Sequence, residues 1–392
     1  MQISYKGSDF HRFSLIRDLF LREVFLMSFR FWPCFCIAAC LSSGAFAAET
    51  NPMALKLGIS GWYEIYAVGA SQSDGPGEPG ANERGFDLKR RAVVNFLGET
   101  RMDQGMRVGF NFGIKGQNDP NDRIDTMYLW FEDDWGRMEV GSLYPPPSMM
   151  HIAAPTVTVF DINDPNYVVA DRGTNMAQDG YVTLYTVYPL LAQKLVYYTP
   201  NIGGFQAGIS YAPENMIDTA YFGMRADNDL DDFGDIWEMV AVYHGGDEDG
   251  LNWGVSGAYA RAGLETASVF YNDDLESWSV GAEVANGPWT VGGGYTFDNY
   301  AMSSGSDNKA WSVGVRYEDE DWRASMTAFR SKIQTGAGNP DDTYNRYVAG
   351  WATDIGPGVE VNASLQYHEF DGALLSSRNT AQVATAGMVV NF

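Results

Sequence analysis

Three stretches in the second half of the chain share one pattern: WGVSGAY at 253–259, WTVGGGY at 289–295 and WSVGVRY at 311–317. Each begins with tryptophan and ends with tyrosine six residues later. Alternate residues of a β-strand share a face, so one face of each stretch is aromatic and apolar, and the other is mostly small or polar. Six residues span about 20 Å along a strand, close to the apolar height of an outer-membrane barrel. The pattern therefore predicts strands that cross a membrane, with an aromatic girdle at each interface.

Units of this kind, 9 to 15 residues long, follow one another from Leu55 onward and are separated by Gly, Asn, Asp or Pro. The links between them alternate in length. The short links are at 102–105, 133–136, 200–203, 247–250, 286–288, 318–321 and 356–358. The long links are at about 70–84, 117–123, 144–190, 213–235, 263–274, 299–308, 333–342 and 370–380.

Seven turns and eight loops separate sixteen strands, so both ends of the strand array lie on the periplasmic side. We predict an all-β fold: a 16-stranded antiparallel transmembrane β-barrel, with turns facing the periplasm and loops outside. Closure also removes unpaired strand edges, which lipid does not tolerate. A soluble β-sandwich with an aromatic core is the alternative, but the small or polar opposite faces and the alternating link lengths favour the barrel.

Residues 27–47 are predicted to be a cleaved signal peptide. Arg30 supplies its positive charge, 31–41 is mostly apolar, and Ala45-Phe46-Ala47 matches an A-x-A cleavage site. The apolar run of about 11 residues is shorter than the roughly 20 needed by a membrane-spanning helix. We interpret residues 1–26 as a misassigned start, with a functional extension as the alternative. A lipoprotein-like box before Cys40 is a competing reading of the processing site.

The mature chain, predicted to be residues 48–392, is acidic and contains no cysteine. All three cysteines, Cys34, Cys36 and Cys40, lie in the signal peptide, which fits export without a disulfide framework. The whole chain carries a net charge of −24, and its first 47 residues hold five basic and three acidic residues, so the mature chain carries −26. A nucleic-acid partner is not expected, because it would require the opposite sign.

An ordered set of motifs resembles Gram-negative general porins, particularly those of alphaproteobacteria, over most of residues 54–392. The matching segments are FLGET and GMRVG (96–109), IDTMY (124–128), WGRMEVG (135–141), MH and AP (150–155), LVYYTP, GFQAG and SYAP (195–213), GPG (356–358) and Phe392. The resemblance implies a homotrimer with one pore per subunit in the outer membrane, among outer-membrane lipid and lipopolysaccharide. Phe392 ends an alternating strand and resembles the signal read by the barrel-assembly machinery. The chain departs from the family in its very long third loop and in a second loop of only about seven residues, the loop that often latches neighbouring subunits in such porins.

We therefore expect a general diffusion porin, a water-filled channel for passive transport of ions and small hydrophilic solutes. A substrate-specific channel on the same barrel is the alternative, for which Tyr181, Tyr185 and Tyr188 are a thin signal. An enzyme is not expected. After the signal peptide only three histidines remain, on different segments, and neither G-x-S-x-G nor H-E-x-x-H occurs.

A barrel of sixteen strands is too wide to be filled by its own side chains, so something must narrow it. The third long loop, 144–190, is the candidate for an inward fold, because so long a loop is improbable unless it is functional. Asp161, Asp164 and Asp171 are its candidate carboxylates. Ordinary solvated acids are the alternative reading of each.

The alternation of the second and third strands predicts which cations face the loop. Phe86, Leu88, Ala92, Val94 and Phe96 fit the lipid face, which places Lys89 and Arg91 inside the bore and leaves Arg90 on the apolar face. In the next strand the same reasoning places Arg107 and Lys115 inside. Opposed cations and carboxylates would produce a transverse field, and the negative charge of the chain predicts a mild preference for cations.

Acidic residues are dense at 227–235, where Asp227, Asp229, Asp231, Asp232 and Asp235 occur. The glycine and glutamate positions of an EF-hand are not matched, so no dedicated metal site or cofactor is predicted. Loosely bound Ca²⁺ or Mg²⁺, including a bridge to lipopolysaccharide phosphates, is the alternative to a solvated loop.

Overall fold

The computed structural model describes residues 55–73, 83–116, 124–158, 170, 191–215, 228–247, 250–268, 271–299, 301, 306–335, 341–372 and 379–392. Within these ranges the chain forms sixteen strands and one short helix. The strands are β1 (Lys56–Gln72), β2 (Phe86–Arg101), β3 (Arg107–Lys115), β4 (Ile124–Asp133), β5 (Gly136–Leu143), β6 (Ala192–Tyr198), β7 (Phe205–Glu214), β8 (Phe233–Gly246), β9 (Asn252–Leu264), β10 (Leu275–Asn286), β11 (Trp289–Asp298), β12 (Ser306–Glu318), β13 (Arg323–Thr335), β14 (Asp342–Gly356), β15 (Val359–Asp371) and β16 (Asn379–Asn391). The helix is α2 (Pro146–Met150). Among the described residues, no helix has the length and apolar character needed to cross a membrane.

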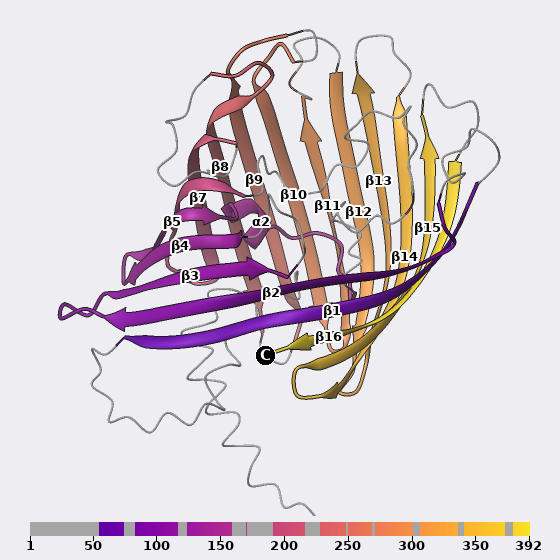
Figure 1. The fold of residues 1–392 in the computed structure, drawn as a ribbon, viewed down its shortest axis with the longest axis horizontal. Coiled ribbons are helices and arrows are strands. Elements are labelled where there is room, and N and C mark those ends of the chain that lie inside the picture. The colour runs from indigo at the N-terminus through magenta and orange to yellow at the C-terminus, as the bar shows by residue number, and fades with distance from the viewer. Residues whose placement is uncertain are drawn as a thin grey trace, which may run out of the picture.

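Each strand pairs antiparallel with its sequence neighbours, and β1 also pairs with β16, so the sheet closes into a barrel (Figure 1). At the seam Gly61 and Phe392 exchange two backbone hydrogen bonds of 2.8 and 3.0 Å. Closure satisfies edge groups that would otherwise cost several kcal/mol each in hydrocarbon. The predicted 16-stranded antiparallel barrel is confirmed.

All seven predicted turns join consecutive strands at one end of the barrel. Glycine occupies turn positions that require positive φ, such as Gly287 at 54° and Gly358 at 71°. The longer links lie at the opposite end, and the structure describes them only in part. Residues 1–54, which include the predicted signal peptide, lie outside the described residues.

The expected strand length of 9 to 15 residues is too narrow. β1 and β2 have 17 and 16 residues, whereas β5 and β6 have only eight and seven. β5 ends at Leu143, just before three successive prolines at 145–147, which have no N–H to continue the ladder. The barrel wall is therefore lowest at β5 and β6, and it is tall at β1, β2 and β12–β16.

Alternation along each strand separates an apolar outer face from a polar inner one. On β9, Trp253 and Val255 are exposed on the outside, while Ser256 and Ala258 are buried on the inside. Aromatic rings gather at two levels of the outer face, as predicted. The pair Trp289–Tyr317 lies beside the turns, with ring centroids 4.9 Å apart, and the pair Trp278–Tyr295 lies nearer the loops.

Candidate pore lining and constriction

Lys89 and Arg91 lie on the inner face of β2, as the alternation predicts. Arg91 is directly across from Glu64 on β1, and its guanidinium carbon is 4.9 Å from the ring centroid of Trp62. Lys89 forms an ion pair with Asp87, two residues away on the same face. This part of the inner wall therefore presents each cation beside a carboxylate.

Arg107 also faces inward, but it belongs to a separate network close to the turns. Its guanidinium contacts Glu99 at 3.2 Å and Glu132 at 3.1 Å, and Arg137 contacts the other oxygen of Glu132 at 3.1 Å. Both guanidinium groups lie near the ring of Trp130, at 5.6 and 4.5 Å from its centroid. A charge-assisted network of this kind holds its members in one geometry.

The four predicted wall cations consequently do not form one group. Lys115 and Arg107 stand at opposite ends of β3, eight residues apart, which corresponds to about 26 Å along a strand. Lys115 pairs in register with Val93, two residues from Arg91 toward the turns, so it lies near the level of Arg91 and far from Arg107. The alternation in the sequence gives the face of each residue but leaves its height in the barrel unspecified.

The first part of the long third loop runs along the inner wall. α2 contacts β7, β8 and β9 (Figure 1). The chain then continues across successive strands, where the backbone N–H groups of Ile152, Ala154 and Val157 donate to inward serine hydroxyls at 2.9, 3.1 and 3.2 Å. The accepting side chains are Ser256 on β9, Ser312 on β12 and Ser325 on β13. Residues 144–158 thus lie against the inner wall of the barrel. Of the rest of the predicted inward loop, the structure describes only residue 170.

Inward-facing glycines leave room for this segment. Gly208, Gly281 and Gly314, together with the three serines, form a surface that we call the glycine–serine track. A Cβ added to Gly281 would lie only 1.8 Å from the carbonyl oxygen of Ile152. At Gly208 it would lie 2.6 Å from Cβ of Pro146, and at Gly314 it would lie 3.2 Å from the carbonyl oxygen of Pro155. This track was not predicted from the sequence, although Gly or Ser occurs at inward positions of several strands.

His151 anchors the segment between α2 and the extended part. The side chain is buried, and its Nδ1 lies 3.3 Å from the hydroxyl of Ser279 on β10. Burial lowers the pKa of His151 to about 4, so the imidazole is neutral at pH 7. A neutral ring fits a site that has little water to solvate a charge.

Three other inward charges were not predicted from the sequence. Lys194 on β6 and Glu238 on β8 form an ion pair of 2.5 Å, and both side chains have no exposed surface. Arg346 on β14 is buried in the inner wall, where it donates to Gln366 at 3.2 Å. In each of these strands apolar residues alternate with polar ones. That alternation indicates that the polar residues face the bore, and it could have identified these charges.

The proposed loop carboxylates Asp161, Asp164 and Asp171 lie outside the described residues. The described members of the acidic stretch, among them Asp229, Asp231 and Asp232, lie at the loop ends of β7, β8 and β9. Glu265 accepts a hydrogen bond from the backbone of Asp229 there, at 2.7 Å. Across the described ranges, no group of three or more His, Cys, Asp or Glu side chains is arranged to hold a metal ion.

A closed sixteen-stranded barrel with a loop folded against its inner wall has a clear counterpart in known families. The model of the Gram-negative porin family matches residues 36–373 of this chain. The chain belongs to the Gram-negative porin family. This porin is therefore an outer-membrane channel, and its family consists of channels rather than enzymes.

Solved structures share the fold of this porin at low sequence identity. The anion-selective porin from Comamonas acidovorans has a TM-score of 0.61 and 13% identity, with 86% of this chain and 100% of that chain covered. The outer membrane protein OmpT of Vibrio cholerae, in its trimer form, has a TM-score of 0.59 and 12% identity over 86% and 100%. The outer membrane channel DcaP of Acinetobacter baumannii has a TM-score of 0.57 and 12% identity over 88% and 99%. No curated protein sequence matches the chain.

Proposed function

We propose that this porin is a general diffusion channel for ions and small hydrophilic solutes. The proposal rests on the position of residues 144–158, which are hydrogen-bonded along the inner wall of the barrel. Without such a segment, a barrel of sixteen strands is too wide to discriminate between small solutes. Such a segment narrows the bore without closing it and leaves polar side chains to line the passage. Selection then depends on size and charge at the narrowest section.

Liposome swelling with sugars of increasing size tests the diffusion function. A general channel gives swelling rates that fall smoothly with solute size, whatever the stereochemistry of the sugar. A single sugar that permeates far faster than its isomers would contradict the proposal and would favour the substrate-specific alternative.

A mild preference for cations is the second part of the proposal. In the described wall the cations are largely matched by carboxylates, as in Arg91 with Glu64 and Lys194 with Glu238. The remaining acids of the mature chain, which carries −26, therefore supply the excess. Among them, Asp161, Asp164 and Asp171 of the constriction loop would face Lys89, Arg91 and Lys115. Arg107, in its network beside the turns, would act further along the bore.

Reversal potentials in a salt gradient across a planar bilayer measure this preference. We expect a cation-selective sign that is reduced when Asp161, Asp164 and Asp171 are replaced together by Asn. Replacing Asp87 by Asn tests the wall in the same way. An anion-selective reversal potential would overturn this part of the proposal. Salt screens charges over about 8 Å, so the reversal potential reports the charges that line the pore. The anion selectivity of the Comamonas acidovorans porin does not decide the question, since the two chains share only the fold.

We propose that the porin is a homotrimer, because the barrel wall is low at β5 and β6. A strand needs about 9 to 11 residues to cross a bilayer, and β5 and β6 have eight and seven. Their outer faces therefore fit a protein contact better than lipid. Neighbouring outward side chains such as Met127, Leu129 and Val140 are large and exposed in the single chain. The mass of the purified complex by native mass spectrometry tests this, and a monomer as the sole species would contradict it.

Export and assembly complete the proposed function. We expect cleavage after Ala47, which N-terminal sequencing of the outer-membrane form would detect. Phe392, half exposed at the barrel seam, is the proposed signal for the assembly machinery. We also propose that divalent cations bind loosely at the acidic loop ends and bridge them to lipopolysaccharide. A chelator should then lower the thermal stability of the porin, by an amount that depends on the salt concentration.

A further inference from the structure

The two strands that meet at the seam carry the same short motif, a glycine followed five positions later by an aromatic residue. On β1 the motif runs from Gly61 to Tyr66, and at the end of the chain it runs from Gly387 on β16 to Phe392. In the antiparallel register Tyr66 lies opposite Gly387, and Gly61 exchanges backbone hydrogen bonds with Phe392. Each aromatic residue therefore falls opposite the glycine of the other strand.

On the inner face, the ring of Tyr66 fills the space that a side chain at Gly387 would occupy. A Cβ added to Gly387 would lie 2.1 Å from Cδ1 and 2.4 Å from Cε1 of that ring. The tyrosine hydroxyl accepts a 3.1 Å hydrogen bond from Nδ2 of Asn362, which lies in the same row one strand further on, in β15. Both side chains are buried. This inner fit therefore connects three strands through one tyrosine.

On the outer face, the ring of Phe392 lies over Gly61. A Cβ added to Gly61 would lie 2.9 Å from Cζ of Phe392 and 2.4 Å from the carbonyl oxygen of Val93 on β2. Because Gly61 and Tyr66 are separated by an odd number of positions, they face opposite sides of the sheet. The seam therefore has one glycine–aromatic fit on each face.

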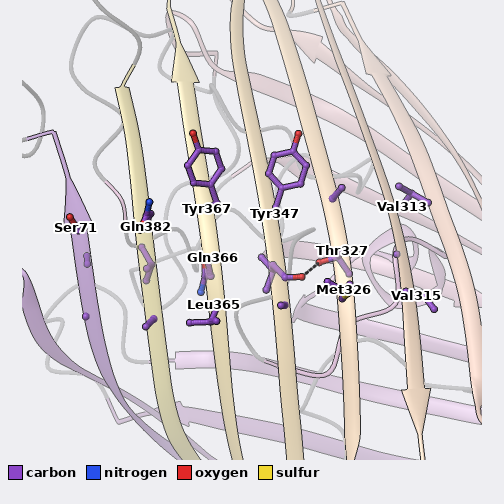
Figure 2. Close-up of a pocket in the computed structure, with 18 of the residues that line it drawn as sticks. Ser71, Val313, Val315, Met326, Thr327, Tyr347, Leu365, Gln366, Tyr367 and Gln382 are labelled. Atoms are coloured by element: carbon purple, nitrogen blue, oxygen red, sulfur yellow. Dashed lines mark hydrogen bonds between the residues drawn. The ribbon is translucent and has the colours of Figure 1, made fainter.

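Alternation alone does not fix the register of the seam. A slip by one residue would turn the apolar face inward, but a slip by two residues keeps every side chain on its own face. The outer pairs beside the seam are Ala67 with Ala386 and Gly69 with Ala384, whose side chains are too small to interlock. The outer surface is hollow there, as Figure 2 shows around Ser71 of β1. Another determinant must therefore exclude slips by two residues.

We propose that the two glycine–aromatic fits, Tyr66 on Gly387 and Phe392 on Gly61, form a register key that lets the barrel close in one register. After a slip by two residues Tyr66 would meet Thr385 or Val389, and β16 has no second glycine to receive the ring. The stagger of the strands is linked to the tilt and width of a barrel. The register key therefore also fixes the width of the bore, whatever solutes pass through it.

The outer fit is lost in the same slips. Phe392 would then meet Ile59 or Tyr63, whose large side chains occupy the place that is open at Gly61. Both fits depend on one register, so a slip in either direction loses both of them at once.

Cysteine cross-links report the register directly. The predicted mature chain, 48–392, contains no cysteine, and it is unfolded in urea and refolded in detergent micelles. Ala67→Cys with Ala386→Cys places two thiols opposite each other in the native register, where a Cα separation of about 5 Å permits a disulfide. Ala67→Cys with Ala384→Cys or with Met388→Cys is diagonal, at about 7 to 8 Å, and cross-links only after a slip by two residues.

We expect the native cross-link in the otherwise unchanged chain. Gly387→Val should reduce the yield of folded barrel about tenfold, because the added side chain overlaps the ring. Adding Tyr66→Ala to Gly387→Val should restore most of that yield. Tyr66→Ala with Phe392→Ala, which lacks both rings, should increase the slipped cross-links about fivefold. Refolding in micelles involves no assembly machinery, so loss of the terminal phenylalanine as a signal does not affect this comparison.

Gly69→Val is the matched control, because a Cβ at Gly69 on the same seam meets nothing closer than 3.9 Å. It should refold and cross-link as the unchanged chain does. An unchanged folded yield in Gly387→Val, or no recovery when Tyr66→Ala is added, would overturn the proposal. The native cross-link alone in the variant that lacks both rings would also overturn it, because the seam would then keep its register without the key.

Discussion

Lys194 and Glu238 form the most deeply enclosed ion pair described in the barrel wall. Both side chains are without exposed surface, and Ser210 adds a 3.2 Å hydrogen bond to the same carboxylate oxygen. Enclosed charges are stable only as a pair, because each has given up its hydration. At the residue scale, the inner wall therefore depends on matched partners more than on net charge.

Replacing Lys194 by Met should lower the free energy of unfolding by about 3 kcal/mol, since the Glu238 carboxylate then remains buried without its cation. The double variant Lys194→Met with Glu238→Leu should recover most of that loss. Urea unfolding in detergent micelles, followed by tryptophan fluorescence, provides the measurement. Lys309→Met, whose side chain is 43% exposed at the outer rim, is the control and should change stability by at most about 1 kcal/mol. A double variant no more stable than the single would refute the pairing argument.

His151 should make the attachment of residues 144–158 to the inner wall sensitive to acid. Burial lowers its pKa to about 4, against about 6.5 for a solvated histidine. The attached state therefore binds fewer protons than the released state between these values, so attachment is full above pH 6.5 and weakens as the pH falls toward 4. Single-channel recordings should show more current fluctuation at pH 5 than at pH 7, with a shift in attachment on the order of tenfold. His151→Gln should remove most of this dependence, and an unchanged acid response in that variant would exclude the histidine as its cause.

At the scale of elements, the glycine–serine track is the feature that gives the channel its shape. It crosses strands from β7 to β13 on their inner faces and accepts a segment that has no regular structure beyond α2. The serines supply acceptors for N–H groups that would otherwise lack partners, and the glycines supply the space.

Gly281→Val should displace the segment, because its Cβ would overlap the Ile152 carbonyl oxygen. We expect an altered single-channel conductance and faster swelling with larger sugars in liposomes. Gly257→Val is the matched control, since a Cβ at Gly257 on the outer face of β9 meets nothing within 4 Å. Identical conductance in the two variants would show that the track does not hold the constriction in place.

At the scale of the whole molecule, the pairing of β1 with β16 closes the barrel, and the inner and outer faces described above exist only in the closed barrel. The seam includes Phe392, whose N–H and carbonyl both bond to Gly61. The barrel also has a low side at β5 and β6, where we propose the subunit contact, and a tall side at β12–β16.

Deleting Phe392 should reduce the amount of folded porin in outer membranes several-fold, through loss of the seam bonds and of the assembly signal. Heat-dependent mobility on electrophoresis distinguishes folded from unfolded barrels in the membrane fraction. Phe392→Tyr keeps the ring and both backbone bonds, so it should assemble normally. Normal folded yield after the deletion would remove Phe392 from both roles.

Strand number, turn positions and the inward or outward face of each residue could be read from the sequence, because a period of two is a local property of extended chain. Lys89, Arg91, Arg107 and Lys115 were assigned to the inner face on this basis. Their separation into a loop-side group and a turn-side network could not be read there, since height in the barrel depends on the stagger between strands. The path of residues 144–158 was likewise decided only by the tertiary structure. Ile152 meets Ser256 and Gly281, more than 100 residues away in the chain, and no local pattern encodes a contact between an irregular segment and a track assembled from separate strands.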